Sequence, residues 1–220
     1  MKLHVAIIPD GNRRWAKARA LKPWKGHESA VENFRGLLEW VEKDGRIGVL
    51  TLWCFSTENW KRDPEEVKHL MDIFRNKLQD ERKTFMEKNI RVVHSGRTDR
   101  LSESLKSLLD EVAAETTKNT SYILHLALDY GGKDEIVRAV QHIKGDITEE
   151  TIREHLDHPE LQDIDLVIRT SGEQRTSNFA LWQSAYAEWM FIEKHFPDFT
   201  GEDLGKALDE FSERKRRYGA

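Results

Sequence analysis

One stretch near the N-terminus decides the fold class: Leu3-His4-Val5-Ala6-Ile7-Ile8-Pro9-Asp10-Gly11-Asn12-Arg13-Arg14-Trp15. Its first half is a β-branched run of strand length, which stops at a proline and passes into a charged turn. Parallel sheets bind ligands beyond the carboxyl ends of their strands, so a polar turn at this point indicates a binding site. Gly11 would let the backbone approach an anion, Arg13 and Arg14 would contact phosphate oxygens, and Asp10 would hold a divalent cation. An ordinary strand-to-helix turn uses the same residue types, so this segment alone leaves both interpretations open.

Two further apolar runs end in the same way. Residues 49–55 lead into Ser56-Thr57-Glu58-Asn59-Trp60-Lys61-Arg62, which offers neutral hydrogen-bonding groups and another arginine. Residues 165–168 lead into Arg169-Thr170-Ser171-Gly172-Glu173-Gln174-Arg175-Thr176-Ser177-Asn178, where two arginines flank a glycine turn and a serine completes a candidate anion cradle. A polar loop, a helix cap or solvated charge explains each segment by itself. Because three separate strands end in the same kind of charged and polar segment, the sequence predicts a binding site for an anionic ligand that is built from all three segments.

Strand-like and helix-like runs alternate along the chain, a pattern typical of an α/β fold with a central, mostly parallel sheet flanked by helices. Apolar residues recur at helical spacing in 31–41, 67–78 and 101–112, residues 90–93 and 122–128 read as strands, and another helix begins near 136. We find no repeat or linker and expect a single domain over residues 1–220. A charged helix from about residue 202, ending in Arg214-Lys215-Arg216-Arg217, is expected to be a solvated face.

Composition favours a cytoplasmic enzyme. The chain has 220 residues, 38% of them hydrophobic and 34% charged, and its formal net charge of -4 gives no general attraction to nucleic acid. The single cysteine, Cys54, excludes an internal disulfide and is expected to be an inert buried thiol. The sequence contains no signal-peptide core and no apolar stretch that could span a bilayer. The nine histidines are scattered and predict no zinc site, whereas His27 follows Gly26 at an expected helix start that would favour phosphate.

The chain resembles the cis-prenyltransferases, the undecaprenyl diphosphate synthase type of isoprenyl diphosphate synthase, over almost its whole length. The matching stretches are residues 4–8, 10–16, Gly26-His27, 50–52, 55–60, Tyr130-Gly131-Gly132, 169–179, Trp182-Gln183, Tyr186 and Glu188. The resemblance implies condensation of isopentenyl diphosphate with an allylic diphosphate, such as farnesyl or geranyl diphosphate, in cis configuration. Diphosphate is released and the product is a polyprenyl diphosphate. It also implies a homodimer, no nucleic acid partner, and peripheral membrane contact for product release.

The resemblance also implies roles for individual residues. Asp10 and Glu188 would hold Mg²⁺, with Asp10 catalytic, and Asn59 would accept the proton or position the diphosphate. The allylic diphosphate would contact Gly11, Asn12, Arg13, Arg14 and His27, and the isopentenyl diphosphate would contact Arg169, Arg175 and Ser177. The other expected substrate-binding residues are Trp15, Ser56, Thr57, Glu58, Trp60, Arg62 and Thr176.

A hydrophobic tunnel for the growing isoprenoid is expected along Trp53, Cys54, Val67, Leu70, Met71 and Phe74. Its depth would limit product length, because each buried CH₂ contributes about 0.8 kcal/mol. Two alternatives stay open: a non-catalytic subunit that stabilises a separate catalytic partner, and a metal-dependent diphosphate hydrolase. The chain departs from the family pattern at Pro23, where many members have an arginine that Lys22 or Lys25 would replace. It departs again at Asp129 and Lys133, where Asn and Arg are frequent.

Overall fold

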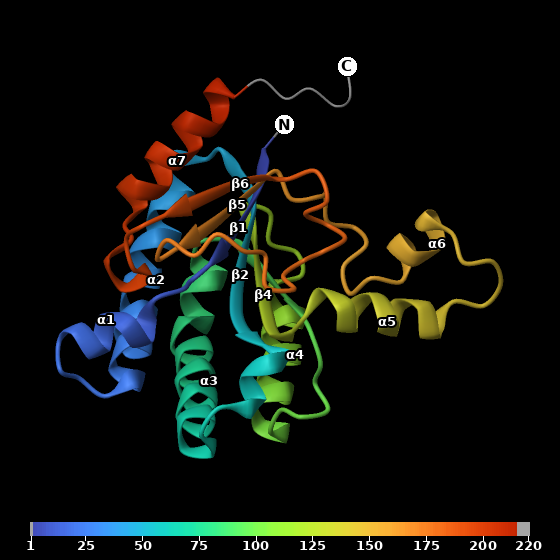
Figure 1. Cartoon of the computed structure of the whole chain (residues 1–220). Helices are drawn as coiled ribbons and strands as arrows, with labels where there is room; N and C mark the ends of the chain where they lie inside the picture. Colours follow the sequence, from blue (N-terminus) through green and yellow to red (C-terminus); the bar gives the residue numbers. More distant parts are fainter. Residues whose placement is uncertain (1, 215–220) are drawn as a thin grey trace.

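The computed structural model describes residues 2–214, which form a six-stranded sheet in the order β3-β4-β2-β1-β5-β6 (Figure 1). The strands are β1 (Leu3–Ile8), β2 (Ile47–Ser56), β3 (Ile90–Ser95), β4 (Tyr122–Tyr130), β5 (Leu166–Thr170) and β6 (Glu188–Ile192). Each pair of neighbouring strands is parallel. The α/β class and the parallel sheet predicted from the sequence are therefore confirmed, while β6 was not predicted.

Both faces of the central strand β1 are covered. Val5 and Ile7 pack into a large apolar core with the long helices, and Ala6 and Ile8 pack into a smaller core on the opposite face. All four side chains are buried. A strand that is buried on both sides reads as a continuous apolar run, which is why residues 3–8 show no alternation with polar residues.

The helices are α1 (Asn12–Ala18), α2 (Pro23–Asp44), η1 (Thr57–Lys61), α3 (Pro64–Glu87), α4 (Glu103–Thr116), α5 (Gly132–His142), α6 (Glu149–Glu154), η2 (Phe196–Asp198) and α7 (Gly201–Glu213). Helices α2, α3, α4 and α5 fall where the apolar spacing predicts them, and α7 falls where the charged helix is expected. α3 begins sharply because Asp63 accepts hydrogen bonds from the backbone N–H groups of Glu65 and Glu66, with Pro64 at the first helical position.

α7 corrects the expectation of a solvated charged helix. Its Leu204, Leu208 and Phe211 side chains are buried in the large core, so only one face of the helix meets water. An amphipathic helix carries many charges on its outer face, and these masked the apolar stripe in the sequence. Residues 215–217 of the expected charged tail lie outside the described part of the chain.

The sheet order explains why three distant segments form one site. β2, β1 and β5 are adjacent, and each carries one of the polar segments directly after its last residues. Ile8 lies beside Arg169 in the β1–β5 pairing, which brings the first and third segments into contact. Since all carboxyl ends of parallel strands lie at one edge, the three segments converge there.

Figure 1 shows α5 and α6 extending from one side of the sheet, away from α2, α3 and α4. Within residues 2–214, no helix combines the length and the apolar character needed to cross a bilayer.

A string of hydrogen bonds connects neutral side chains that lie on the adjacent strands β1, β2, β4 and β3. His4 Nδ1 donates to the Gln162 carbonyl (2.7 Å), so its Nε2 accepts from the Thr51 hydroxyl (2.7 Å). His125 Nδ1 then donates to Thr51 (2.9 Å), and its Nε2 accepts from Ser95 (2.7 Å). Each of the two imidazole rings donates one hydrogen bond through Nδ1 and accepts one through Nε2. A second proton, on Nε2, would therefore face a hydroxyl group that is already donating to that nitrogen.

This string predicts acid-sensitive stability. Burial lowers the pKa of His4 and lowers that of His125 further, so below pH 6.5 the unfolded chain binds protons that the folded chain does not. The free energy of unfolding should therefore fall between pH 7.5 and 5.5, by about 1.4 kcal/mol per histidine for each pH unit below 6.5. Urea unfolding at both pH values measures this decrease. His125→Gln should show a smaller decrease than wild type, and His155→Gln, an exposed control, an unchanged one; equal decreases in both variants would contradict the assignment.

Candidate active site

Three connected cavities lie at the carboxyl edge of β2, β1 and β5. A first anion cavity of about 710 Å³ is lined by Pro9, Asp10, Gly11, Asn12, Arg13, Arg14, Lys17, Ala20, Leu21, Pro23, His27, Arg62, Glu173 and Arg175. The polar lining of a second anion cavity, of about 560 Å³, comprises Asp10, Asn12, His27, Ser56, Glu58, Asn59, Arg62, Arg169, Arg175, Ser177 and Asn178. An apolar cavity opens beside them and shares Pro9, Asn12 and His27 with both. Most of the residues predicted from the three segments are thus brought together around one space.

The two anion cavities carry an excess of positive charge. Six lysine or arginine side chains line them against three carboxylates, although the whole chain has a formal charge of -4. Glu173 is shared between Arg14 (2.8 Å) and Arg175, and Glu66 is shared between Arg13 (3.7 Å) and Arg62 (3.3 Å). Arginines that share an acid retain unsatisfied donors, so the cavities are suited to anions with several oxygens.

Asp10 sits at the boundary of the two anion cavities as an ionised carboxylate. Its Oδ1 accepts the Gly11 N–H (2.7 Å) and its Oδ2 accepts Arg169 Nη2 (2.9 Å). Burial acts to raise the pKa of Asp10, but the hydrogen bonds from Arg169 and Gly11 outweigh it and hold the pKa below its usual range. Gly11 has φ 95°, and a Cβ there would lie 2.6 Å from His195 Nδ1, so the turn requires glycine.

His27 presents a buried hydrogen-bond donor to all three cavities. The Asn12 amide donates to the Pro9 carbonyl (3.2 Å) and to His27 Nδ1 (3.3 Å), which places the proton of the neutral ring on Nε2. That Nε2 is buried and has no partner within the described chain. Burial, helped by the charges of Arg62 and Arg13, lowers the pKa of His27 to about 4. The ring is therefore neutral at pH 7 and can donate one hydrogen bond to a ligand oxygen.

The third segment forms a cradle around Arg169, which is only 4% exposed. Its Nη1 donates to Ser177 Oγ (2.8 Å) and to the Arg175 carbonyl, while its Nε is buried without a partner among the described residues. Ser177 and Asn178 both have positive φ, 53° and 70°, so the backbone turns sharply around the guanidinium group. Strained backbone of this kind concentrates at binding sites.

The second segment assigns Asn59 a donor role. Asn59 Oδ1 accepts the Ser56 backbone N–H (3.1 Å) in a capping box at the start of η1, so its oxygen is already engaged. The amide group left to face the second anion cavity is the NH₂, which donates. Positioning a diphosphate, one of the roles expected for Asn59, fits this geometry, because the NH₂ group can donate to a ligand oxygen.

Glu188 does not lie beside Asp10 within one chain. It is the first residue of β6, opposite Leu166 at the start of β5, whereas Asp10 follows the end of β1. The two carboxylates therefore lie at opposite edges of the sheet, and Glu188 pairs with Arg214 (3.1 Å). Within residues 2–214, no three side chains of the metal-binding types His, Cys, Asp and Glu converge on one point.

Four predicted substrate-binding residues lie outside the cavity linings. Trp15 Nε1 donates to Asp198 (2.8 Å) and Trp60 Nε1 to Asp129 (2.8 Å). Thr57 contacts Glu58 (3.1 Å), and Thr176 lies in the loop around Arg169. None of these four residues lines either anion cavity.

Three charged or amide residues of the lining were not among the predicted site residues: Lys17, Glu173 and Asn178. Lys17 is one helical turn beyond Arg13, a spacing that could have revealed it. The lysines expected to compensate for Pro23 do not line the cavities: Lys25 pairs with Glu28 (2.6 Å), and Lys22 lies 4.8 Å from the centre of the Trp24 ring. Lys17 therefore supplies the additional cation.

The two later departures from the family pattern lie at the end of β4 and at the start of α5. The Asp129 carboxylate is fully buried and accepts from Trp60 Nε1 (2.8 Å) and Arg100 Nε (2.9 Å), which ties η1 to the loop after β3. An asparagine would offer one acceptor oxygen and no charge to Arg100. The Lys133 backbone N–H donates to Asn178 Oδ1 (2.8 Å), so α5 anchors the third segment whatever its side chain.

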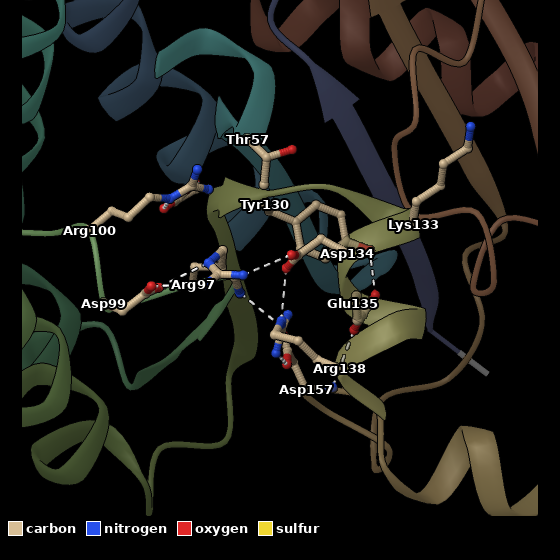
Figure 2. Close-up of polar contacts among 12 residues, drawn as sticks. Thr57, Arg97, Asp99, Arg100, Tyr130, Lys133, Asp134, Glu135, Arg138 and Asp157 are labelled. Atoms are coloured by element: carbon tan, nitrogen blue, oxygen red, sulfur yellow. Dashed lines mark hydrogen bonds and ion pairs between the residues drawn. The ribbon is translucent and has the colours of Figure 1, made fainter. Parts of the chain in front are cut away.

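Ion pairs brace the start of α5 beside the site (Figure 2). Arg138 donates to Asp134 (2.9 Å) and to Asp157 (2.5 Å), and the Tyr130 hydroxyl donates to Glu135 (2.5 Å). Because these charges satisfy one another, this network buttresses the site and leaves the anion cavities to the three strand-end segments.

The apolar cavity has a volume of about 110 Å³ and lies between the sheet, α2, α3 and α4. Of the residues expected to line a tunnel, Cys54, Leu70 and Phe74 line it, while Trp53, Val67 and Met71 do not. Burial raises the pKa of the Cys54 thiol to about 12, as expected for an inert cysteine.

Comparison with known proteins identifies the family. The family described as "Putative undecaprenyl diphosphate synthase" matches residues 8–219. The isoprenyl transferase of Thermotoga maritima is 44% identical over 98% of this chain and 96% of its own length. A tritrans,polycis-undecaprenyl-diphosphate synthase (geranylgeranyl-diphosphate specific) of Pyrococcus abyssi is 42% identical over 98% of this chain and 86% of its own. The crystal structure of lavandulyl diphosphate synthase from Lavandula x intermedia, in complex with dimethylallyl diphosphate, superposes with a TM-score of 0.94 at 35% identity, covering 99% of this chain and 98% of that one.

Fold and site thus define a transferase that handles diphosphate substrates. The chain belongs to the undecaprenyl diphosphate synthase family of prenyltransferases, as its motifs predicted.

Proposed function

We propose that the protein condenses isopentenyl diphosphate with an allylic diphosphate in cis configuration and releases diphosphate. The observation that carries the proposal is the joining of two cation-rich cavities and one apolar cavity at Asn12 and His27. Two diphosphates and one hydrocarbon chain fit such a space, whereas a diphosphate hydrolase needs only one anion cavity.

In this proposal the first anion cavity holds the allylic diphosphate through Arg13, Arg14 and Lys17, and His27 Nε2 donates to one of its oxygens. The second anion cavity holds the isopentenyl diphosphate through Arg169, together with the Arg175, Ser177 and Asn59 side chains that line it. The new carbon–carbon bond forms as the allylic carbon–oxygen bond breaks, and the departing diphosphate takes the electron pair. The isopentenyl unit then loses a proton to a water or a diphosphate oxygen in the second anion cavity, which leaves the new double bond. Fixed donors around the departing diphosphate stabilise its developing charge.

The donor set around Asp10 fits Mg²⁺. A single ionised carboxylate between two candidate phosphate sites suits Mg²⁺, because this ion is commonly bound through one or two carboxylates together with water and substrate phosphates. Asp10 would hold the ion, and Glu188 of the same chain, at the other sheet edge, would not share it. When bound, Mg²⁺ supplies positive charge to the diphosphate oxygens. The chain's own contribution is to keep Asp10 ionised and oriented through Arg169 and Gly11.

The test is a product assay on purified protein. With Mg²⁺, labelled isopentenyl diphosphate and dimethylallyl, geranyl or farnesyl diphosphate, we expect labelled products that are longer than the primer. Free diphosphate without elongated lipid would favour hydrolysis, and no product from any primer would favour the non-catalytic partner subunit.

We further propose a homodimer that meets membranes only peripherally, when product is released. The projecting pair α5 and α6 supports it, because Val137 and Ile147 are 55% and 61% exposed there (Figure 1). Light scattering should give twice the chain mass of 25.7 kDa, and Val137→Lys should shift the mass toward the monomer.

A further inference from the structure

The Tyr130-Gly131-Gly132 motif lies where β4 ends and α5 begins. A Cβ at Gly131 would lie 2.6 Å from Thr57 Oγ1 and 2.9 Å from Asn178 Nδ2. The backbone at Gly131 is extended, with φ -154°, so space rather than backbone conformation requires a glycine here. Gly131 therefore has no side chain because one residue of the second segment and one residue of the third meet against it.

Asn178 anchors the third segment on the first turn of α5. Its backbone carbonyl accepts the Gly132 N–H (2.7 Å), and its Oδ1 accepts the Lys133 N–H (2.8 Å). The first N–H groups of a helix have no partner within the helix, and Gly131 at the N-cap has no side chain to supply one. Asn178 also has φ 70°, which asparagine accepts more readily than most residues. The third segment is thus fixed to α5 at Asn178.

The side-chain NH₂ group of Asn178 reaches across to the second segment. It donates to Glu58 Oε1 (3.0 Å), and we call this hydrogen bond the clasp. Glu58 Oε2 accepts from Ser56 Oγ and from Thr57 Oγ1 (3.1 Å). Burial acts to raise the pKa of Glu58, but the hydrogen bonds from Ser56 and Asn178 outweigh it and hold the pKa below its usual range. The acceptor in the clasp is therefore an ionised carboxylate.

Both residues of the clasp line the second anion cavity. A carboxylate in such a cavity weakens the binding of a diphosphate unless its charge is used elsewhere. Glu58 uses its charge to hold donors from both segments. Asn59 follows Glu58 directly, and Ser177, which accepts from Arg169 (2.8 Å), directly precedes Asn178. The clasp thus joins the immediate neighbours of side chains that line the same cavity.

We propose that the clasp sets the distance between the second and third segments and thereby the affinity of the second anion cavity for isopentenyl diphosphate. Glu58 and Asn178 are positioning residues, because they act through Asn59, Ser177 and Arg169. The inference rests on the proposed function, which supplies the identity of the diphosphate, and it adds the contact that shapes the cavity.

The loss of the clasp should act on one substrate only. It should raise Kd and KM for isopentenyl diphosphate and leave kcat at saturating substrate within a few-fold of wild type, because it removes binding that the ground state and the transition state share. KM for the allylic substrate should also stay within a few-fold, since neither Glu58 nor Asn178 lines the first anion cavity.

The test exchanges the donor and the acceptor of the clasp. Asn178→Asp keeps the shape, the Oδ1 acceptor for Lys133 and the tolerance of a positive φ, but it turns two carboxylates toward each other. Calorimetric titration with isopentenyl diphosphate should give a Kd about tenfold above wild type, from one lost hydrogen bond and one like-charge contact. Adding Glu58→Gln supplies an NH₂ group that donates to the new carboxylate, while the glutamine oxygen still accepts from Ser56. The double variant should recover a Kd within a few-fold of wild type.

A second pair of variants tests the space above Gly131. Gly131→Ala places a methyl group against Thr57 and Asn178, so it should push the two segments apart and raise the Kd for isopentenyl diphosphate by about tenfold. Gly36→Ala is the matched control, because a Cβ at Gly36 on α2 meets no atom within 4 Å. It should leave Kd and kcat unchanged, and thermal unfolding establishes that each variant folds.

Three results would overturn the inference. They are wild-type affinity for isopentenyl diphosphate in Asn178→Asp or Gly131→Ala, a double variant that binds no better than Asn178→Asp, and a fall in kcat with an unchanged KM. The titrations need no turnover, so they test the clasp even if wild type binds isopentenyl diphosphate and elongates no primer, a result that would overturn the proposed function alone. A wild-type protein that binds no isopentenyl diphosphate would overturn both.

Discussion

Asp10→Asn is expected to lower kcat by about 1,000-fold, the size of effect seen when one group that stabilises transition-state charge is removed. Asparagine keeps the shape and one acceptor oxygen for the Gly11 N–H, but it removes the charge that faces Arg169 and Arg14 (3.5 Å). It also removes the ligand that we assign to Mg²⁺. Steady-state rates at saturating substrates, measured with a series of Mg²⁺ concentrations, give the effect.

The control for this variant is Asp198→Asn. Asp198 is also a carboxylate near α1, but its side chain is 46% exposed, it bonds Trp15, and it lines neither anion cavity. Its kcat should remain within a few-fold of wild type, and thermal unfolding should show that both variants fold. An Asp10→Asn protein with undiminished kcat would contradict the role of Asp10.

Arg169→Met is expected to lower kcat/KM for isopentenyl diphosphate by about 100-fold or more, since truncating one member of a buried charged pair costs 2–5 kcal/mol. The substitution leaves Asp10 Oδ2 and Ser177 Oγ without their buried partner and removes an unpartnered Nε donor. Arg169→Lys should recover part of the loss, because lysine restores the charge but not the planar fork.

The second arginine of the cradle provides the comparison. The Arg175 side chain is 59% exposed and pairs only with Glu173 on the surface of the site, so Arg175→Met should cost about tenfold or less. The order of the two effects follows from burial alone. Equal losses in both variants would contradict the view that Arg169 organises the cradle.

The sequence predicted the parts of this molecule that depend on local patterns. The apolar run of residues 3–8 and the polar turn after it define β1 and the Asp10 segment without reference to the rest of the chain. The convergence of the segments could also be expected, because parallel strands share an edge. The adjacency of β2, β1 and β5 depends on which strands pair with one another over long distances in the sequence, and only the structure shows this pairing.

The sequence could not predict roles that depend on the orientation of a strand or of a side-chain amide. Glu188 begins a strand instead of ending one, and its short run gave no sign of which edge it would face. Asn59 has an amide with both a donor and an acceptor, and only the capping hydrogen bond to Ser56 shows which is left over. Lys17 and Lys25 are equally basic in sequence, but helix phase and the Glu28 pair separate them.

The central claim is that one chain binds two diphosphates at once, and calorimetric titration tests it most directly. The protein would first be saturated with an unreactive allylic thiodiphosphate and Mg²⁺, and then titrated with isopentenyl diphosphate. The account predicts one isopentenyl diphosphate per chain, with an affinity that the allylic analogue does not weaken and that Arg169→Met lowers far more than Arg175→Met. Loss of isopentenyl diphosphate binding in the presence of the analogue would mean that both ligands compete for a single anion site, and it would contradict the divided site.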